Sequence, residues 1–232
     1  MKELKGRLIV KFIDDKFIPS TMDGNIHFSS YEYFKKLEED SNDKGKSDKN
    51  ENAEYKVLDP KKDILFIRRI PKGSKSLGAT NLKGAIRLDY DNATFRTSYP
   101  KEDKEYGIAS FTVIDPDKDL ENGKIKADFI NDVSEISNNR RALLFSEYDL
   151  KESLNKFASN KELYNVMYGN VEYTNNNNGR RNGFQKDLRF SNQHEWRIRI
   201  NMDALNSNGD IFLPGLNIDL ADNLERIIII DK

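Results

Sequence analysis

Short β-strand patterns recur along the chain, and this recurrence limits the possible folds more than any other feature. Leu8–Phe12, Tyr106–Ile114 and Arg141–Phe145 are rich in β-branched and aromatic residues, a composition that favours strands. Polar and glycine-containing segments separate them. The sequence therefore predicts a sheet built from many short strands.

Two pairs of these segments are spaced as hairpins. Ala85–Tyr90 and Ala93–Thr97 flank an Asp-Asn dipeptide, which is a good two-residue turn. Further along, Tyr164–Thr174 and Phe184–Arg189 flank an Asn-rich loop near 175–183, whose composition suits a long hairpin connection. We therefore expect each pair to be antiparallel neighbours.

One late strand alternates strictly between apolar and polar residues. In the segment 194–201, Trp196, Ile198 and Ile200 share one side, and Arg197 lies on the other. Because successive side chains of a strand point to opposite faces, we expect the apolar side inward and Arg197 outward.

Helical periodicity is restricted to two segments. Ser29 precedes a Glu by three residues, which is a capping box, and the helix after it is expected to end near Glu39. A second helix is expected to begin at Asp149 and to place Leu150 and Leu154 toward the core.

These elements predict a single α+β domain over residues 1–232. It would hold a mainly antiparallel, twisted sheet with two or three helices, because no Pro/Gly/Ser linker divides the chain. A charged loop is expected near 40–54, and Arg226–Ile230 is expected to form a buried closing strand.

Composition excludes several classes of function. The chain has 38 Lys or Arg and 39 Asp or Glu, a formal charge of -1, which argues against nucleic acid as the main partner. It has no cysteine and two histidines, which excludes Cys-ligated metal sites and a zinc site with three His ligands, and we expect no metal site. No Gly-rich phosphate loop of standard spacing occurs, and we expect no cofactor. No signal-peptide pattern and no apolar run of ~20 residues is present. We therefore expect a cytoplasmic protein that does not bind membranes.

The most specific segment runs from Phe184 to Ile198 and reads FQKDLRFSNQHEWRI. It resembles the F-x-K…E-W-R-I signature of the DUF2971-like group, a family of uncharacterised bacterial and phage proteins. Ile26–Ser30, the aromatic pair Tyr33-Phe34 and Ser47–Glu51 resemble the N-terminal pattern of the same group. The resemblance implies a phage or prophage protein that acts in phage–host conflict, with no established reaction.

Glu195 has a structural and a functional interpretation. In a strand it shares a face with Arg197, where both can pair with neighbouring strands, and Lys186 is a candidate partner of Glu195. Alternatively, Glu195 projects into a cleft with Lys186 and Arg197, where the three hold or polarise an anionic ligand.

The tripeptide Gln193-His-Glu195 also resembles the Gln-x-Glu motif of ADP-ribosyltransferases. The resemblance implies NAD as cofactor and Glu195 as the catalytic carboxylate, which stabilises an oxocarbenium-like transition state. It also assigns Arg7 to the arginine of the first strand. Ser110-Phe-Thr112 supplies two of the three hydroxyl positions of the family's Ser-Thr-Ser strand.

Two further groups are candidates for ligand or partner binding. Asp48 and Glu51 belong to the acidic loop, where interleaved lysines argue against a divalent cation and favour a solvated segment. Arg180, Arg181 and Arg189 surround the Asn-rich loop, and arginines of this kind are common phosphate contacts.

These observations lead to three hypotheses. The first is a phage-type accessory protein, an inhibitor that binds a host protein or a small nucleotide ligand without catalysis. The second is an ADP-ribosyltransferase-like enzyme that uses Glu195. The third is a nucleic-acid-associated protein that uses Arg180, Arg181 and Arg189, and the charge balance argues against it.

Overall fold

A computed structural model describes most of the chain, and the chain divides into two compact units. The described residues are 7–40, 52–69, 82–91, 93–159, 165–175 and 179–226. For residues 37–40 and 226 the description is limited to the backbone. The larger unit comprises Met1–Asn52, Tyr99–Asn175 and Arg181–Lys232, and the smaller unit comprises Ala53–Ser98 and Asn176–Arg180.

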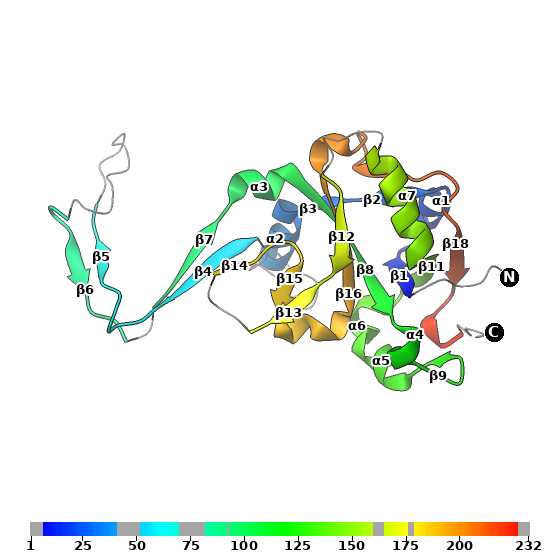
Figure 1. Ribbon diagram of the computed structural model, residues 1–232, viewed down its shortest axis with the longest axis horizontal. Coiled ribbons are helices and arrows are strands. Elements are labelled where there is room, and N and C mark those ends of the chain that lie inside the picture. Colours follow the sequence, from blue (N-terminus) through cyan, green and yellow to red (C-terminus); the bar gives the residue numbers. More distant parts are fainter. Residues whose placement is uncertain are drawn as a thin grey trace. The chain divides into compact units, whose positions relative to one another are not determined.

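The larger unit is built on a seven-stranded sheet (Figure 1). Its strand order is β12-β16-β8-β1-β11-β18, with β3 also paired to β8, and every pairing is antiparallel. The bounds are β1 Leu8–Ile13, β3 Ser29–Ser30, β8 Tyr106–Ile114, β11 Arg141–Ser146, β12 Met167–Asn170, β16 Glu195–Asn201 and β18 Ile218–Ala221. This confirms the predicted α+β class with a mainly antiparallel sheet.

Smaller elements complete this unit. Its two-stranded pairs join β2 Asn25–His27 to β17 Asp210–Phe212, β9 Leu120–Glu121 to β10 Lys124–Ile125, and β13 Glu172–Thr174 to β15 Gln185–Asp187. The α-helices are α1 Ile18–Met22, α2 Tyr31–Asp40, α3 Pro100–Glu105, α4 Pro116–Asp119, α5 Ala127–Asp132, α6 Ser134–Ser137 and α7 Glu147–Ser159. Short 3-10 helices are η1 Asp15–Phe17, η3 Leu188–Gln193, η4 Met202–Ala204 and η5 Leu224–Arg226.

One face of the central strands, which we call the core face, carries the main hydrophobic core. Trp196 pairs in register with Phe111, and their rings meet edge to face with centroids 5.8 Å apart. Leu150 and Leu154 of α7 are fully buried in the same cluster. Burial of each such side chain contributes roughly 1.5–3 kcal/mol, so this face fixes the orientation of β16.

The opposite face, which we call the site face, is apolar in one part and polar in another. Val10 pairs with Thr112, and Thr112 pairs with Glu195, so all three side chains point to this face. Val10 packs in a second core with Phe129 and Val133 from the α5–α6 region. Next to that core, the site face is polar at Thr112 and Glu195.

The smaller unit consists of two small sheets. One sheet has the order β14-β4-β7, with bounds Gly179–Arg180, Ala53–Leu58 and Ala93–Ser98. The other pairs β5 Leu65–Ile67 with β6 Ile86–Leu88. β4 begins inside the charged loop predicted near 40–54, and β14 lies inside the Asn-rich loop predicted near 175–183.

Both predicted helices are present, with caps that differ from the prediction. α2 is capped by Ser30, whose Oγ accepts a hydrogen bond from the Tyr33 amide at 3.2 Å. α7 begins two residues before the predicted Asp149, because Ser146 Oγ accepts from the Asp149 amide at 3.4 Å. In both cases a serine at the end of a strand caps the helix that follows it.

Both predicted hairpins are wrong. β7 pairs with β4, and β6 pairs with β5, so the two strands that flank the Asp-Asn turn are not partners. β13 and β15 do pair, but in parallel. The predicted closing strand lies outside the described residues beyond Arg226.

Candidate functional site

A polar site lies on the site face of the sheet, at β16 and its neighbour β8. Glu195 and Arg197 both point to this face, since they alternate with Trp196 and Ile198 on the core face. Ser110 and Thr112 of β8 lie directly opposite Arg197 and Glu195 in the register. The alternation was predicted correctly, but Arg197 is only 2% exposed, so the prediction that it faces solvent is wrong.

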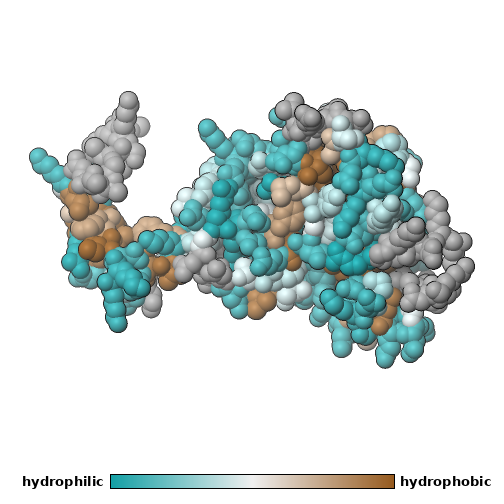
Figure 2. Space-filling view, viewed as in Figure 1, coloured by the Kyte–Doolittle hydropathy of each residue, from teal (hydrophilic) through white to brown (hydrophobic). Residues whose placement is uncertain are grey.

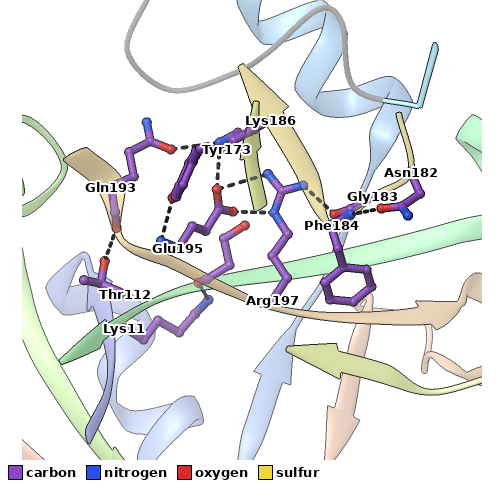
Figure 3. A network of polar contacts seen from close by, with 11 residues as sticks. Lys11, Thr112, Tyr173, Asn182, Gly183, Phe184, Lys186, Gln193, Glu195 and Arg197 are labelled. Carbon is purple, nitrogen blue, oxygen red and sulfur yellow. Dashed lines mark hydrogen bonds and ion pairs between the residues drawn. The ribbon is translucent and has the colours of Figure 1, made fainter. Parts of the chain in front are cut away.

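Lys186 and Arg197 both bind the Glu195 carboxylate (Figure 3). Lys186 Nζ donates to Glu195 Oε2 at 2.8 Å, and Arg197 Nε donates to Glu195 Oε1 at 2.5 Å. A second guanidinium nitrogen of Arg197 lies 3.2 Å from Glu195 Oε2. Lys186 also donates to Gln193 Oε1 at 2.8 Å. Four polar side chains from β15, η3 and β16 are thereby joined in one buried network.

The backbone around this network holds it in place. Arg197 Nη1 donates to the carbonyl oxygen of Gly183 at 2.8 Å, and the Glu195 amide donates to the Tyr173 hydroxyl at 2.7 Å. Gly183 is packed so closely that an added Cβ would lie 1.5 Å from Tyr31 Oη. Position 183 therefore requires glycine, because this close approach leaves no room for a side chain.

The Glu195 carboxylate remains ionised although it is buried. Burial raises the pKa of Glu195, but the charges of Arg197 and Lys186, and the hydrogen bonds from both, lower it further and bring the pKa to about 2. A carboxylate with such a pKa is a weak base near neutral pH. Its role in this arrangement is to hold two cations in fixed positions.

The network forms one wall of a cavity of about 290 Å³. This volume is at the lower end of the range of roughly 300–1,000 Å³ found for small-molecule sites. Polar lining comes from Ser110, Thr112, Arg140, Lys186, Gln193, Glu195 and Arg197. Apolar and aromatic lining comes from Val10, Phe12, Tyr33, Phe34, Phe111 and Ile136.

Positive charge exceeds negative charge in this lining. Three cations, Arg140, Lys186 and Arg197, line the cavity with the single carboxylate of Glu195. Arg140 Nε also lies 3.3 Å from Asp14 Oδ1, and Asp14 is not part of the lining. In a partly enclosed site such an excess attracts anions more strongly than it does on an open surface. Tyr33, which also lines the cavity, is 51% exposed and offers a ring to a flat ligand.

A further lysine lies beside the cavity, at an interruption in the sheet. β8 pairs with β1 at residues 112–114 and with β3 at 107–108, and these pairings leave Ala109–Phe111 between them. Lys11 Nζ donates to the Ser110 carbonyl there at 3.3 Å. Burial, together with the charge of Arg140, lowers the pKa of Lys11 to about 8. Lys11 thus stabilises the strand edge that borders the site.

Arg7, the arginine assigned by the ADP-ribosyltransferase resemblance, is not brought to Glu195. Its guanidinium pairs with Glu147 at 2.6 Å and donates to Asn170 Oδ1 at 3.1 Å. Asn170 is opposite Trp196 in the register, which places this contact on the core-face side of the sheet. Glu195 lies on the site face. Gln193 and Thr112, by contrast, both lie at the cavity.

The predicted arginine group near the Asn-rich loop is divided. Arg180 belongs to the smaller unit, whereas Arg181 and Arg189 belong to the larger one. Arg181 is 3% exposed, with Nη2 3.7 Å from Asp187 Oδ2, so it cannot be part of a solvent-facing patch. Arg189 is exposed, and its guanidinium lies 4.5 Å from the centre of the Phe190 ring.

The acidic-loop candidates Asp48 and Glu51 lie outside the described residues. Within the described part, no group of three or more His, Asp or Glu side chains is placed to hold a metal ion. In that same part of the chain, no helix is both long enough and apolar enough to cross a membrane.

Sequence reasoning did not select Arg140, Tyr33 or Phe34 as site residues. Arg140 belongs to an Arg-Arg pair, and the two aromatic residues fall on a predicted helix, so their place in the cavity lining is what identifies them as site residues. Comparison of the chain with known protein families, curated proteins and solved structures finds no match.

Proposed function

We propose that this chain binds a small anionic ligand with a flat group, of the size of a nucleotide, in the cavity beside Glu195. The excess of fixed positive charge in the cavity lining carries the proposal. Lys186 and Arg197 are positioned before any ligand arrives, because Glu195 holds both. Such preorganisation lowers the cost of ordering side chains on binding.

The proposed role is binding without turnover. The low pKa of Glu195 leaves the carboxylate a poor general base near neutral pH. Its two oxygens already accept hydrogen bonds from Lys186 and Arg197. Of the two partners predicted from the sequence, a host protein and a small nucleotide, the cavity favours the nucleotide. The DUF2971-like resemblance suggests that this binding serves as an inhibitory step in phage–host conflict.

Calorimetry with AMP, adenosine and inorganic phosphate tests the proposal. We expect AMP to bind more tightly than either of its parts, since it presents both an anion and a flat ring. Arg140→Ala should weaken AMP binding about tenfold or more, because a charge-assisted contact contributes roughly 1.5–3 kcal/mol. Arg141→Ala is the matched control, since Arg141 is the neighbouring arginine in the sequence, is also paired with a carboxylate, and is not among the residues that line the cavity. Equal affinities of the two variants, or no binding of AMP at millimolar concentration, would contradict the proposal.

The ADP-ribosyltransferase hypothesis is tested separately with labelled NAD. An enzyme of that kind would transfer label to protein or hydrolyse NAD, and Glu195→Ala would abolish both activities. The binding proposal predicts no turnover by the wild-type protein under conditions in which AMP is bound. Turnover above the Glu195→Ala background would replace the binding proposal with the enzymatic one.

A further inference from the structure

The two units carry opposite net charge, although the whole chain is almost neutral. The smaller unit holds eleven Lys or Arg and five Asp or Glu, a formal charge of +6. The remaining residues of the chain hold 27 and 34 respectively, a formal charge of -7. The charge balance therefore says nothing against an anionic partner for the smaller unit.

Large apolar side chains are also exposed on this basic unit. Phe66 is 38% exposed and Phe95 47%, and Ile67 and Ile86 are more than half exposed. Figure 2 shows hydrophobic residues at the surface of β5 and β6 beside hydrophilic ones. Small two-stranded sheets are marginally stable alone, so a partner that covers these side chains would stabilise the unit.

Each exposed phenylalanine lies directly across from a cation on the neighbouring strand. Phe66 of β5 is opposite Arg87 of β6, and Phe95 of β7 is opposite Lys56 of β4. Directly opposite residues in an antiparallel pair project to the same face. Arg87 and Lys56 are themselves well exposed, at 66% and 63% of their side chains. The two sheets thus repeat the same combination of ring and cation.

This combination fits a single-stranded nucleic acid. Unpaired bases stack on aromatic rings, and the phosphates between them contact Lys and Arg, largely without regard to sequence. The ion pairs that these cations make, Lys56 with Asp63 at 3.0 Å and Arg87 with Asp89 at 3.9 Å, are exposed. Exposed pairs are weak and readily exchanged for phosphate contacts. An acidic protein surface would neutralise the charge but would not use both rings.

We propose that the smaller unit binds single-stranded nucleic acid through the pairs Phe66–Arg87 and Phe95–Lys56. This site is separate from the cavity beside Glu195, whose lining residues belong to the larger unit. It uses different residues from the arginines 180, 181 and 189 that sequence reasoning selected.

Fluorescence anisotropy with a labelled 20-nucleotide oligo(U), titrated with the full chain between 50 and 300 mM salt, tests the proposal. We expect binding whose affinity falls steeply with salt. Phe66→Ala with Phe95→Ala should weaken binding at least tenfold and leave the salt dependence unchanged, because the stacking surfaces are lost and the charges remain. Lys56→Gln with Arg87→Gln should reduce the slope of log K against log salt by about 1.4, at about 0.7 per phosphate contact on a single strand.

Three controls make the result decisive. Phe17→Ala removes a comparably exposed ring from the larger unit and should leave oligo(U) affinity unchanged. Arg140→Ala should also leave it unchanged, since Arg140 lines the cavity. Circular dichroism should show both double variants folded, as expected for changes at exposed positions.

The proposal is overturned by any of four results. These are no oligo(U) binding at 50 mM salt, wild-type affinity in the double phenylalanine variant, loss of binding in Arg140→Ala, or equal competition by polyglutamate of the same length. The last result would identify a general site for polyanions or acidic proteins.

Discussion

Lys186 Nζ lies 2.8 Å from Glu195 Oε2, and both side chains are almost completely buried. Arg197 binds the same carboxylate from the same strand. One anion thus holds two cations inside the protein, and the group carries a net positive charge at the cavity wall.

Glu195→Gln should destabilise the larger unit by about 3–5 kcal/mol. The substitution removes the counter-charge and leaves two buried cations, which is the costly way to break a buried ion pair. Urea denaturation measures the loss. Glu152→Gln is the control, since Glu152 forms an exposed pair with Lys156 and should cost less than about 1 kcal/mol. Similar losses in the two variants would show that Glu195 is not a structural anchor.

The stabilising effect of Glu195 should depend on pH in the acid range. The pKa of this group is about 2 in the folded protein and near 4.5 when unperturbed. Its contribution to the unfolding free energy is therefore fully present above pH 4.5 and is lost as the pH falls through about 2. Glu147 shifts in the same direction, mainly through its hydrogen bond from Arg7. The difference between wild type and Glu195→Gln, measured by denaturation from pH 6 to pH 2, isolates Glu195 and should shrink with acid.

The Lys11 amine should titrate near pH 8, and the charge of Arg140 is one cause of this low pKa. Burial and the Arg140 charge lower the pKa of Lys11 from 10.5 to about 8. The folded state therefore binds fewer protons at this group than the unfolded state, so its contribution to stability rises between about pH 8 and pH 10.5. Arg140→Gln should move the midpoint upward. Competitive amine labelling of Lys11 against pH measures it, and an unchanged midpoint would exclude Arg140 as a cause.

Gly183→Ala should destabilise the site even though it adds only a methyl group. The new Cβ would meet Tyr31 Oη at 1.5 Å, so either α2 or the segment at 183 must shift. This shift would also disturb the hydrogen bond from Arg197 to the Gly183 carbonyl oxygen. Overpacking of this kind costs about 1–3 kcal/mol. Tyr31→Phe in the Gly183→Ala background, which removes the Oη atom nearest to the new Cβ, should recover part of the loss. Thermal melts compare the two variants, and equal melting temperatures would contradict the close contact.

Local patterns predicted the strands and their faces. The alternation along 194–201 placed Trp196 inward and Glu195 with Arg197 on the opposite face, because side-chain direction in a strand follows from position alone. The nearness of Lys186 to Glu195 was also anticipated from the sequence. Charge totals were less informative, since a balance over 232 residues concealed a basic unit and an acidic one.

The tertiary structure decided which strands became partners and what covered each face. β7 pairs with β4 instead of the nearer β6, and β13 pairs in parallel with β15, so a favourable local turn does not by itself decide the partner of a strand. Arg197 was predicted to face water, yet it is 2% exposed and donates to the carbonyl oxygen of Gly183, which comes from another part of the chain. The sequence by itself determined the direction of each side chain along its strand. The surroundings of each side chain depend on contacts between residues far apart in the chain, and no local pattern encodes these contacts.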